Sequence, residues 1–276
     1  MTLFDAHCHL HDPRLDPFRE GALREARAAG IAGFACCGTE EDDWPAVLEL
    51  AAREPDLVPF LGLHPWSVAA AAPGWLDRLE ALLAAHAWVG VGEAGLDLAR
   101  GGLAPPEEQE AALLAQLWLA RRLGRPIALH GVRAWGRLLA LLDPLGPQEP
   151  GLLLHSFSGP AELVPALAAL GAFFSFGGVL TRSSASRVHA AARAVPPDRI
   201  LVETDAPDIL PILGPEGLAD PSLPRDAAGR PVNLPVNLRV NLAALARLRS
   251  EPEESLGARC RANALALLAP LLAARS

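Results

Sequence analysis

Runs of consecutive apolar residues alternate along this chain with longer stretches in which apolar residues recur every three to four positions. A short continuous apolar run is typical of a strand buried on both faces, and the wider spacing is typical of an amphipathic helix. We predict strands at Leu3–Ala6, Ile31–Cys36, Leu57–Leu63, Trp88–Glu93, Pro126–His130, Gly151–His155, Ala172–Phe176 and Ile200–Glu203. We predict helices at Pro17–Ala29, Asp43–Arg53, Gly74–His86, Pro106–Leu123, Ala134–Leu142, Ala161–Leu170, Ser183–Ala194, Asn233–Arg249 and Glu253–Leu272.

This alternation predicts a parallel sheet covered by helices. Eight strand–helix units in 276 residues favour a (β/α)8 barrel, the TIM barrel, formed as a single domain over residues 1–276. A doubly wound open sheet is the alternative fold, because periodicity alone does not show that a sheet closes. The segment Pro207–Pro231 is rich in proline, glycine and aspartate, and at the C-terminal face of a barrel it would form a rim around the substrate.

The composition, with 51% hydrophobic and 20% charged residues, is that of an ordered globular protein. A net charge of −8 opposes a general role in coating nucleic acid, since phosphate binding usually shows as a basic surface. It does not oppose phosphate chemistry at a metal site, where cations supply the positive charge. Lysine is absent, so every fixed basic side chain is an arginine.

Several features predict a cytoplasmic protein that has no membrane partner. The four cysteines have neither zinc-ribbon nor disulfide spacing, so we expect reduced, buried thiols. No basic start or small-residue cleavage site follows Met1, so we expect no secretory signal. The longest charge-free stretch, about Leu163 to Thr181, contains Pro165 and several glycines, which makes it a poor membrane span.

The first predicted strand leads into two histidines at alternate positions, His7 and His9. Side chains at positions i and i+2 of an extended backbone leave the same face. Both imidazoles could therefore reach one metal ion from a rigid strand end. The alternative for this pair alone is a polar strand end before the turn at His11-Asp12-Pro13.

Histidines and carboxylates recur at the C-terminal ends of the predicted strands. They are His7 and His9 on the first strand, His64 on the third, Glu93 on the fourth, His130 on the fifth, His155 on the sixth and Asp205 on the eighth. Independent surface histidines would scatter over helices and loops, as His86 and His189 do. Because a barrel builds its active site at these strand ends, the distribution favours one metal site there.

Four imidazoles and two carboxylates exceed the needs of one tetrahedral zinc ion, but suit two divalent ions that together activate a water. Glu93 is the best bridge between the ions. We predict that His7, His9 and Asp205 complete the coordination of one ion, and that His130 and His155 complete the coordination of the other. Asp205 is also placed to take the proton of the water. Mixed nitrogen and oxygen ligation admits Mg2+, Mn2+ or Zn2+.

The motifs around these residues resemble those of the TatD-type metal-dependent deoxyribonucleases. The motifs are His7-Cys8-His9, Gly62-Leu63-His64-Pro65, Gly92-Glu93-Ala94-Gly95-Leu96-Asp97, Leu129-His130, His155-Ser156-Phe157-Ser158-Gly159, Phe174-Ser175-Phe176-Gly177-Gly178, Glu203-Thr204-Asp205-Ala206-Pro207 and Asn233-Leu234-Pro235. The resemblance covers essentially the whole chain. It implies a barrel, a two-metal centre and hydrolysis of phosphodiesters, typically from the 3′ end of DNA.

The sequence departs from the family pattern at positions that flank the predicted ligands. Arg133 is shifted by one position from the family's usual His-x-Arg, and Trp66 follows His64-Pro65. Asp208 stands where an aromatic residue is common, and Leu234 replaces a usual acidic residue. These departures bear on substrate preference and leave the predicted ligand set intact.

Three residues are candidates for substrate contact. His64 would contact phosphate or support a ligand, or else it is a strand-end histidine satisfied by backbone. Arg133 would bind a phosphate with its planar guanidinium, or else it lies exposed in the first turn of a helix. Trp66 would stack on a base, or else it packs on the barrel rim.

We therefore expect a metal-dependent phosphodiester hydrolase, acting as a 3′–5′ exonuclease on single-stranded DNA or on another phosphodiester. The first alternative is an amidohydrolase of small amides or lactones; many such enzymes bridge two ions with a carbamylated lysine, which this chain lacks. The second is a metal-containing nucleic-acid-binding module without turnover. The sequence predicts no particular oligomeric state.

Overall fold

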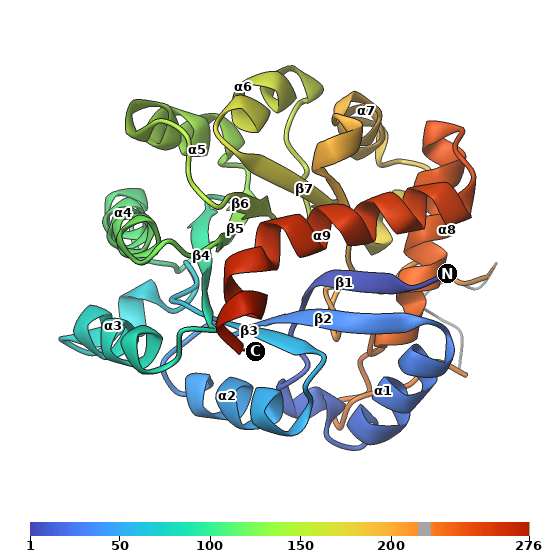
Figure 1. Cartoon of the computed structure of the whole chain (residues 1–276), viewed down its shortest axis with the longest axis horizontal. Coiled ribbons are helices and arrows are strands. Elements are labelled where there is room, and N and C mark those ends of the chain that lie inside the picture. Colours follow the sequence, from blue (N-terminus) through green and yellow to red (C-terminus); the bar gives the residue numbers. More distant parts are fainter. Residues whose placement is uncertain (215–221, 276) are drawn as a thin grey trace.

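Eight parallel strands form one sheet in a computed structural model, and their spatial order follows the sequence from β1 to β8 (Figure 1). The strands are β1 (Leu3–Cys8), β2 (Ile31–Cys37), β3 (Leu57–Leu61), β4 (Gly90–Asp97), β5 (Ile127–Val132), β6 (Leu152–Leu154), β7 (Ala172–Phe176) and β8 (Ile200–Val202). The sheet curls until its first and last strands meet. Asp205 N donates to His7 O at 2.9 Å, and His9 N donates to Ala206 O at 2.7 Å. The barrel prediction is confirmed, and the open-sheet alternative is wrong.

Helices surround the barrel in the described residues, which are 1–214 and 222–275. They are α1 (Arg19–Ala28), α2 (Trp44–Arg53), α3 (Trp75–Ala85), α4 (Pro106–Leu123), α5 (Trp135–Leu142), α6 (Val164–Ala169), α7 (Ser186–Ala194), α8 (Leu238–Arg249) and α9 (Glu253–Arg275). The predicted elements match these closely. Two predicted bounds are wrong by four residues or more: the fourth strand does not end at Glu93 but continues to Asp97, and the helix predicted from Asn233 begins at Leu238.

The bounds of α4 follow directly from its terminal residues. Pro106 is its first residue, where a missing N–H costs nothing, and Glu107 and Glu108 lie at the positive end of its dipole. Gly124 ends the helix in the left-handed region, with φ of 63°, which glycine adopts without steric penalty. The helix therefore begins and ends where its local sequence predicts.

The helix α9 crosses the N-terminal end of the barrel (Figure 1). Ala264, Leu267 and Leu271 of this helix belong to one buried cluster with Phe4 of β1 and Phe60 of β3. Among the described residues, α9 is the one helix that is long and apolar enough to cross a membrane. Its packing is that of a core helix, which meets the same criteria of length and composition.

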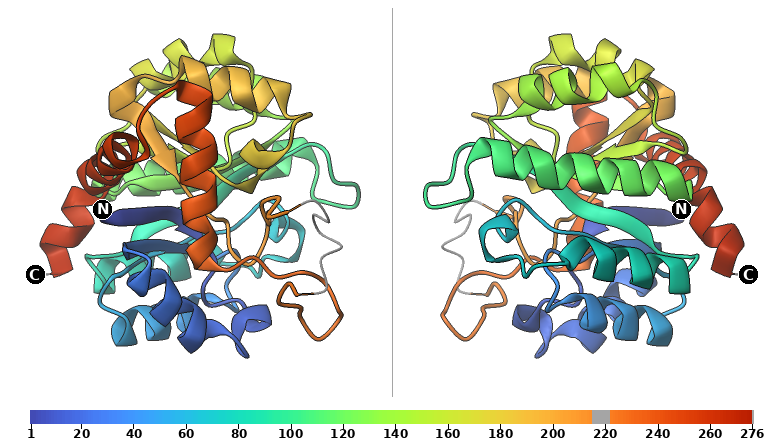
Figure 2. Two further views of the ribbon diagram at one scale, coloured as in Figure 1. Left: turned by 90° about the vertical axis from the view of Figure 1, so that its right-hand side faces the viewer. Right: turned by 90° about the vertical axis from the view of Figure 1, so that its left-hand side faces the viewer.

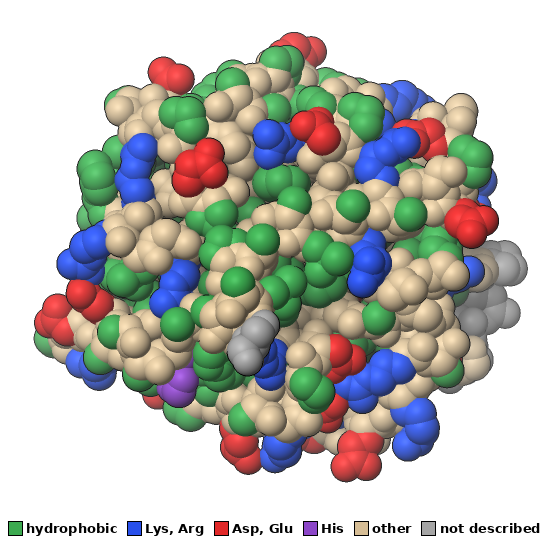
Figure 3. All heavy atoms as spheres, viewed as in Figure 1, with side chains coloured by type: hydrophobic (Ala, Val, Ile, Leu, Met, Phe, Trp, Pro, Cys, Tyr) green, Lys and Arg blue, Asp and Glu red, His purple; other side chains and the backbone are tan. Residues whose placement is uncertain are grey.

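Acidic and basic side chains are interspersed over the face in Figure 3, which displays no broad basic surface for nucleic acid.

The connection after β8 projects from the end of the barrel opposite α9 (Figure 2). This position agrees with the predicted substrate rim at Pro207–Pro231, of which residues 215–221 lie outside the described part. Asn233 holds the base of the connection, because its Nδ2 donates to Thr204 O at 2.8 Å and to Asp208 O at 2.9 Å. The four cysteines are buried and unbridged, as predicted.

Candidate metal centre

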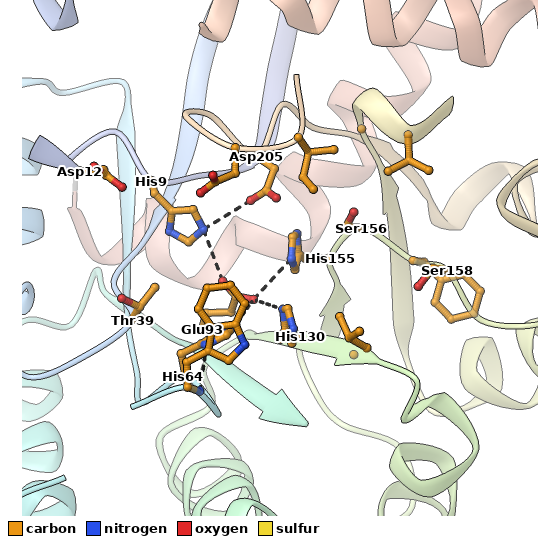
Figure 4. Close-up of a pocket in the computed structure, with 18 of the residues that line it drawn as sticks. His9, Asp12, Thr39, His64, Glu93, His130, His155, Ser156, Ser158 and Asp205 are labelled. Carbon is orange, nitrogen blue, oxygen red and sulfur yellow. Dashed lines mark hydrogen bonds and ion pairs between the residues drawn. The ribbon is translucent and has the colours of Figure 1, made fainter. Parts of the chain in front are cut away.

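A cavity of about 650 Å3 opens at the C-terminal ends of the strands (Figure 4). Five of the six predicted ligands line it: His9, Glu93, His130, His155 and Asp205. The sixth, His7, is fully buried and contacts the same group, with its Nε2 3.2 Å from Glu93 Oε2. Residues from β1, β4, β5, β6 and the end of β8 thus meet at one point, although they are far apart in the sequence.

The carboxylate of Glu93 lies at the centre of this group, and each of its oxygens faces different imidazoles. Glu93 Oε2 is 3.2 Å from Nε2 of His7 and 3.5 Å from Nε2 of His9. Glu93 Oε1 is 2.9 Å from Nδ1 of His130 and 3.4 Å from Nε2 of His155. A carboxylate with one oxygen on each side is the arrangement that a bridge between two ions requires.

Three overlapping groups of side chains have ligand atoms within 4.8 Å of one another. These groups are His7 with His9 and Asp205, His7 with Glu93 and His155, and His64 with Glu93 and His130. The first group is the predicted set for one ion. The second group places His155 beside His7, although these two residues were predicted to bind different ions. The third group places His64 beside His130. The His64 ring therefore belongs to the edge of the centre, with its Nε2 3.5 Å from Glu93 Oε1.

The donor spacing fits divalent cations. Two nitrogen donors of one tetrahedral ion at about 2.1 Å are separated by about 3.4 Å. The Nε2 atoms of His7 and His9 are 3.3 Å apart, and His9 Nε2 is 3.4 Å from Asp205 Oδ1. The His130 ring turns Nδ1 toward Glu93, at 2.9 Å, and Nε2 toward Asp97 Oδ2, at 3.7 Å. Ligand atoms packed as closely as those of His7, His9 and Asp205 are expected where a cation completes the site.

The electrostatics of the centre also demand positive charge. Burial alone would raise the pKa of Glu93, but His155, His7 and His64 outweigh burial and hold that pKa well below its usual range. Burial alone would lower the pKa of His9, but Asp205 and Glu93 raise it to about 10. In the absence of cations, the ionised carboxylates therefore draw protons onto imidazoles that must be neutral to bind metal. A divalent cation satisfies the same carboxylates without those protons.

Backbone and side-chain acceptors fix the rings of two of these histidines. His9 Nδ1 lies 2.7 Å from the backbone oxygen of Cys37, which leaves Nε2 directed at Glu93 and Asp205. His155 Nδ1 lies 3.2 Å from Oε1 of Glu203, a fully buried carboxylate that also accepts from Ser156 N at 2.8 Å. Such contacts select the tautomer that presents Nε2 to a metal.

The sequence pattern gave no prediction of a role for Glu203. The residue lies two positions before Asp205 in the Glu-Thr-Asp motif, and this alternation was the available signal. The pattern also predicted no role for Asp5, which is fully buried and accepts from Thr204 N at 2.8 Å. Burial raises the pKa of Asp5 well above its usual range. Together with Asn233, Asp5 holds the end of β8, where Asp205 has a positive φ of 59°.

An irregularity in the sheet turns Glu93 toward the cavity. Val91 pairs with Ile127 and Ala94 pairs with Leu129, so three steps along β4 match two along β5. Such an extra residue bulges the strand and redirects its side chains. Val91 and Ala94 both belong to the main apolar cluster of the molecule. In a regular strand Glu93 would share a face with Val91, and the bulge places it on the opposite one.

The structure separates the predicted substrate contacts. Trp66 lines the cavity, is 49% exposed, and donates through Nε1 to Asp97 Oδ2 at 2.7 Å. The guanidinium of Arg100 lies 4.2 Å from the centre of the Trp66 ring. Arg133, in contrast, does not line this cavity, called the metal cavity below; it lines a neighbouring hollow and has a positive φ of 53°. Sequence spacing did not distinguish these two positions.

Asp208 at the rim of the cavity is paired with an arginine from the other end of the chain. Arg14 donates through both terminal nitrogens to the Asp208 carboxylate, at 2.8 and 2.7 Å. Its Nε also donates to Asp12 Oδ2 at 3.0 Å. Asp208, which stands where the family that this sequence resembles commonly has an aromatic residue, therefore binds the guanidinium of Arg14, and both residues line the cavity.

Comparison with known proteins shows which sequences and structures this chain resembles. Residues 4–269 match the family model described as TatD related DNase. The protein named 3'-5' ssDNA/RNA exonuclease TatD from Erwinia billingiae is 34% identical over 272 residues, covering 95% of this chain and 97% of that protein. The crystal structure of the TatD homologue YJJV from Escherichia coli is 30% identical, with a TM-score of 0.85 over 96% of this chain and 97% of that one. A TatD-family hydrolase from Entamoeba histolytica is 18% identical, covers 97% of this chain and 98% of that one with a TM-score of 0.80, and shares the fold.

Proposed function

The chain belongs to the family of TatD-related deoxyribonucleases, which hydrolyse phosphodiester bonds, and from this we propose that it removes nucleotides from the 3′ end of single-stranded DNA. The observation that carries the proposal is the central carboxylate of Glu93, with histidines facing both of its oxygens. The names of its relatives support the direction of cleavage and the single-stranded substrate. They do not favour an amidohydrolase or a module without turnover.

The proposed centre holds two divalent ions, Mg2+, Mn2+ or Zn2+. His7, His9 and Asp205 would hold one ion, His130 and His155 would hold the other, and Glu93 would contact both. When bound, the ions would polarise the scissile phosphate and lower the pKa of a water for in-line attack. The buried site keeps bulk water away from these carboxylates, since Glu93 is 1% exposed and Asp205 is 7% exposed.

Asp205 is the proposed proton acceptor. Its Oδ1 faces His9 and His7, at 3.4 and 3.8 Å. Its Oδ2 has no hydrogen bond within the described residues, and Asp205 lines the cavity. Burial would raise the pKa of Asp205, but His155, His9 and His7 outweigh burial and lower it, so the carboxylate is ionised and free to accept a proton.

Trp66 is the proposed platform for a base. About half of its surface is exposed at the cavity, and its edge is fixed by Asp97. An aromatic ring stacks on any base, which suits an enzyme that degrades a strand of mixed sequence. His64 lies between Trp66 and the metal centre, and it is the proposed uncharged contact to the substrate there, because burial lowers its pKa to about 4.

A 5′-labelled single strand incubated with Mg2+, Mn2+ or Zn2+ tests the proposal. We expect a ladder that shortens from the 3′ end, and no turnover of amides or lactones. Glu93→Gln and Asp205→Asn should each lower kcat about 10³-fold, while Glu108→Gln on the exposed start of α4 serves as the matched control. Full activity in both centre variants would overturn the residue assignment, and absence of cleavage by the wild type with every metal would overturn the function.

A further inference from the structure

A second hollow, of about 760 Å3, adjoins the metal cavity on the side of α5 and α7. Val132, Ser158, Val179 and Val188 line both cavities, so the two cavities lie side by side. Figure 4 displays Ser158 on the side of the metal cavity away from His9. A strand held at the metal centre can therefore extend toward this hollow.

Two arginines without partners line the hollow. Arg133 follows β5 and Arg187 lies in the first turn of α7. Neither side chain has an ion pair, hydrogen bond or ring contact with any described residue, whereas Arg14 at the metal cavity is paired with two carboxylates. No carboxylate is among the described residues that line the hollow. In a chain of net charge −8, an acid-free hollow with two unpaired guanidinium groups is a local site of positive charge.

Polar groups of the protein add to this charge. The hollow is bounded by the first residues of α5 and of α7, and no side chain caps the N-terminus of either helix. Uncapped backbone N–H groups and the positive ends of both dipoles favour an anion. Ser158 Oγ accepts from Trp135 Nε1 at 3.2 Å, which fixes the oxygen and leaves the hydroxyl proton free to donate. Planar guanidinium groups combined with such donors match the oxygens of a phosphate.

We propose that this hollow binds a backbone phosphate adjacent to the scissile one. The inference rests on the proposed function, since it assigns a place to the next nucleotide of the same strand. The position next to the metal cavity favours a phosphate within a polynucleotide over a free phosphate ion. A second phosphate contact holds the strand in place while its terminal bond lies at the centre.

The test compares substrates that carry one phosphate with substrates that carry two. Arg187→Ala should raise the KM for a trinucleotide about tenfold more than the KM for bis-p-nitrophenyl phosphate, because one charge-assisted contact is lost. The slope of log affinity against log salt should fall by about one for each arginine removed. Arg193→Ala is the matched control, because Arg193 lies exposed near the end of the same helix and lines none of the cavities described here.

Binding measured in EDTA, with a fluorescent single strand, provides a readout without turnover. Replacing the phosphate adjacent to the scissile one by a neutral methylphosphonate should weaken binding to the wild type about tenfold. The same replacement should have little further effect in the double variant Arg133→Ala/Arg187→Ala. Equal behaviour of Arg187→Ala and Arg193→Ala in this assay would overturn the inference.

The two proposals fail separately. If the wild type cleaves neither substrate with any metal, the proposed function is wrong, and binding in EDTA still tests the hollow. If the wild type cleaves both substrates but Arg187→Ala matches its control, only the hollow is wrongly assigned. Inorganic phosphate tests the other source of the same chemistry. Weaker binding of free phosphate by Arg187→Ala, with oligonucleotide binding unchanged, would overturn the assignment to a strand.

Discussion

The carboxylate of Glu203 accepts a hydrogen bond from Nδ1 of His155 at 3.2 Å, so the opposite nitrogen of that ring points at Glu93. Both residues are buried, and Glu203 also accepts from Ser156 N and Ser175 Oγ. A ligand histidine held in this way loses little freedom when it binds metal. The carboxylate thus influences the proposed metal centre without lying against the cavity.

Glu203→Gln should weaken divalent metal binding about 10- to 100-fold, because the amide no longer supports the ring as a charged acceptor. Isothermal titration with Mn2+ measures this directly, and the metal concentration for half-maximal cleavage gives a second reading. Glu162→Gln, an exposed change in the short 3-10 helix Ala161–Leu163, is the control. Identical metal affinity in Glu203→Gln and the control would show that the hydrogen bond does not support metal binding.

Metal removal should lower the thermal stability of the protein. A cation at 100 times its Kd stabilises the folded state by about 2.7 kcal/mol, which corresponds to about 5 °C or more in Tm for a chain of this size. Thermal denaturation in EDTA, followed by addition of Mn2+, measures the difference. In Glu93→Gln the rise on adding metal should be largely lost. A full rise in that variant would argue against a bridging role for Glu93.

Trp66→Ala should raise the KM for single-stranded DNA about tenfold, because stacking on one base contributes about 1–3 kcal/mol. Trp66→Phe should retain most of the affinity, since it keeps an aromatic face. Trp118→Ala on α4 is the matched control, because Trp118 is 56% exposed but does not line the cavity. Steady-state kinetics with a short oligonucleotide will decide, and equal effects of the two alanine variants would contradict stacking.

Asp208→Asn should lower the KM for DNA about threefold, because it removes a negative charge from the rim and loosens the hold on Arg14. The side chain of Asp208 is more than a third exposed, so the loss in the free energy of unfolding should stay below about 1 kcal/mol. The salt dependence of KM should also steepen, since Arg14 becomes available to phosphate. A higher KM in Asp208→Asn would instead indicate that the pair positions the loop.

Glu251 should stabilise the fold at neutral pH more than in acid. Arg249 donates to it at 2.8 Å and, together with Arg259, holds the pKa of Glu251 below its usual range. A carboxyl whose folded pKa is lowered contributes stability above its unfolded pKa and loses it as the pH falls through the folded value. Glu251→Gln should therefore lower the free energy of unfolding by up to about 1 kcal/mol at pH 7 and by less at pH 4. Urea denaturation at both pH values tests this against Glu25→Gln, and an equal loss at both would contradict it.

The sequence by itself determined the succession of elements and the identity of the residues that meet at the mouth of the barrel, and it favoured the barrel over an open sheet. These properties are local: Pro106, Glu107 and Gly124 define a helix within one segment, and the parallel order of short strands brings their C-terminal ends together. His7 and His9 share a face because extended backbone repeats every two residues. The family resemblance rests on the same short motifs, so it too was available before the fold.

Only the tertiary structure decided which way those side chains point and what supports them. Phe4 lies inside the barrel and Cys8 lies in the outer apolar layer, so the alternation of β1 breaks between them, where its register with β2 shifts. A bulge of this kind arises from pairing with a neighbouring strand and leaves no mark in the apolar pattern. The contact of His155 with Glu203, 48 residues later, and the separation of Arg133 from the metal cavity likewise depend on packing between distant segments. Periodicity describes how one segment folds, whereas these arrangements depend on the relative positions of several.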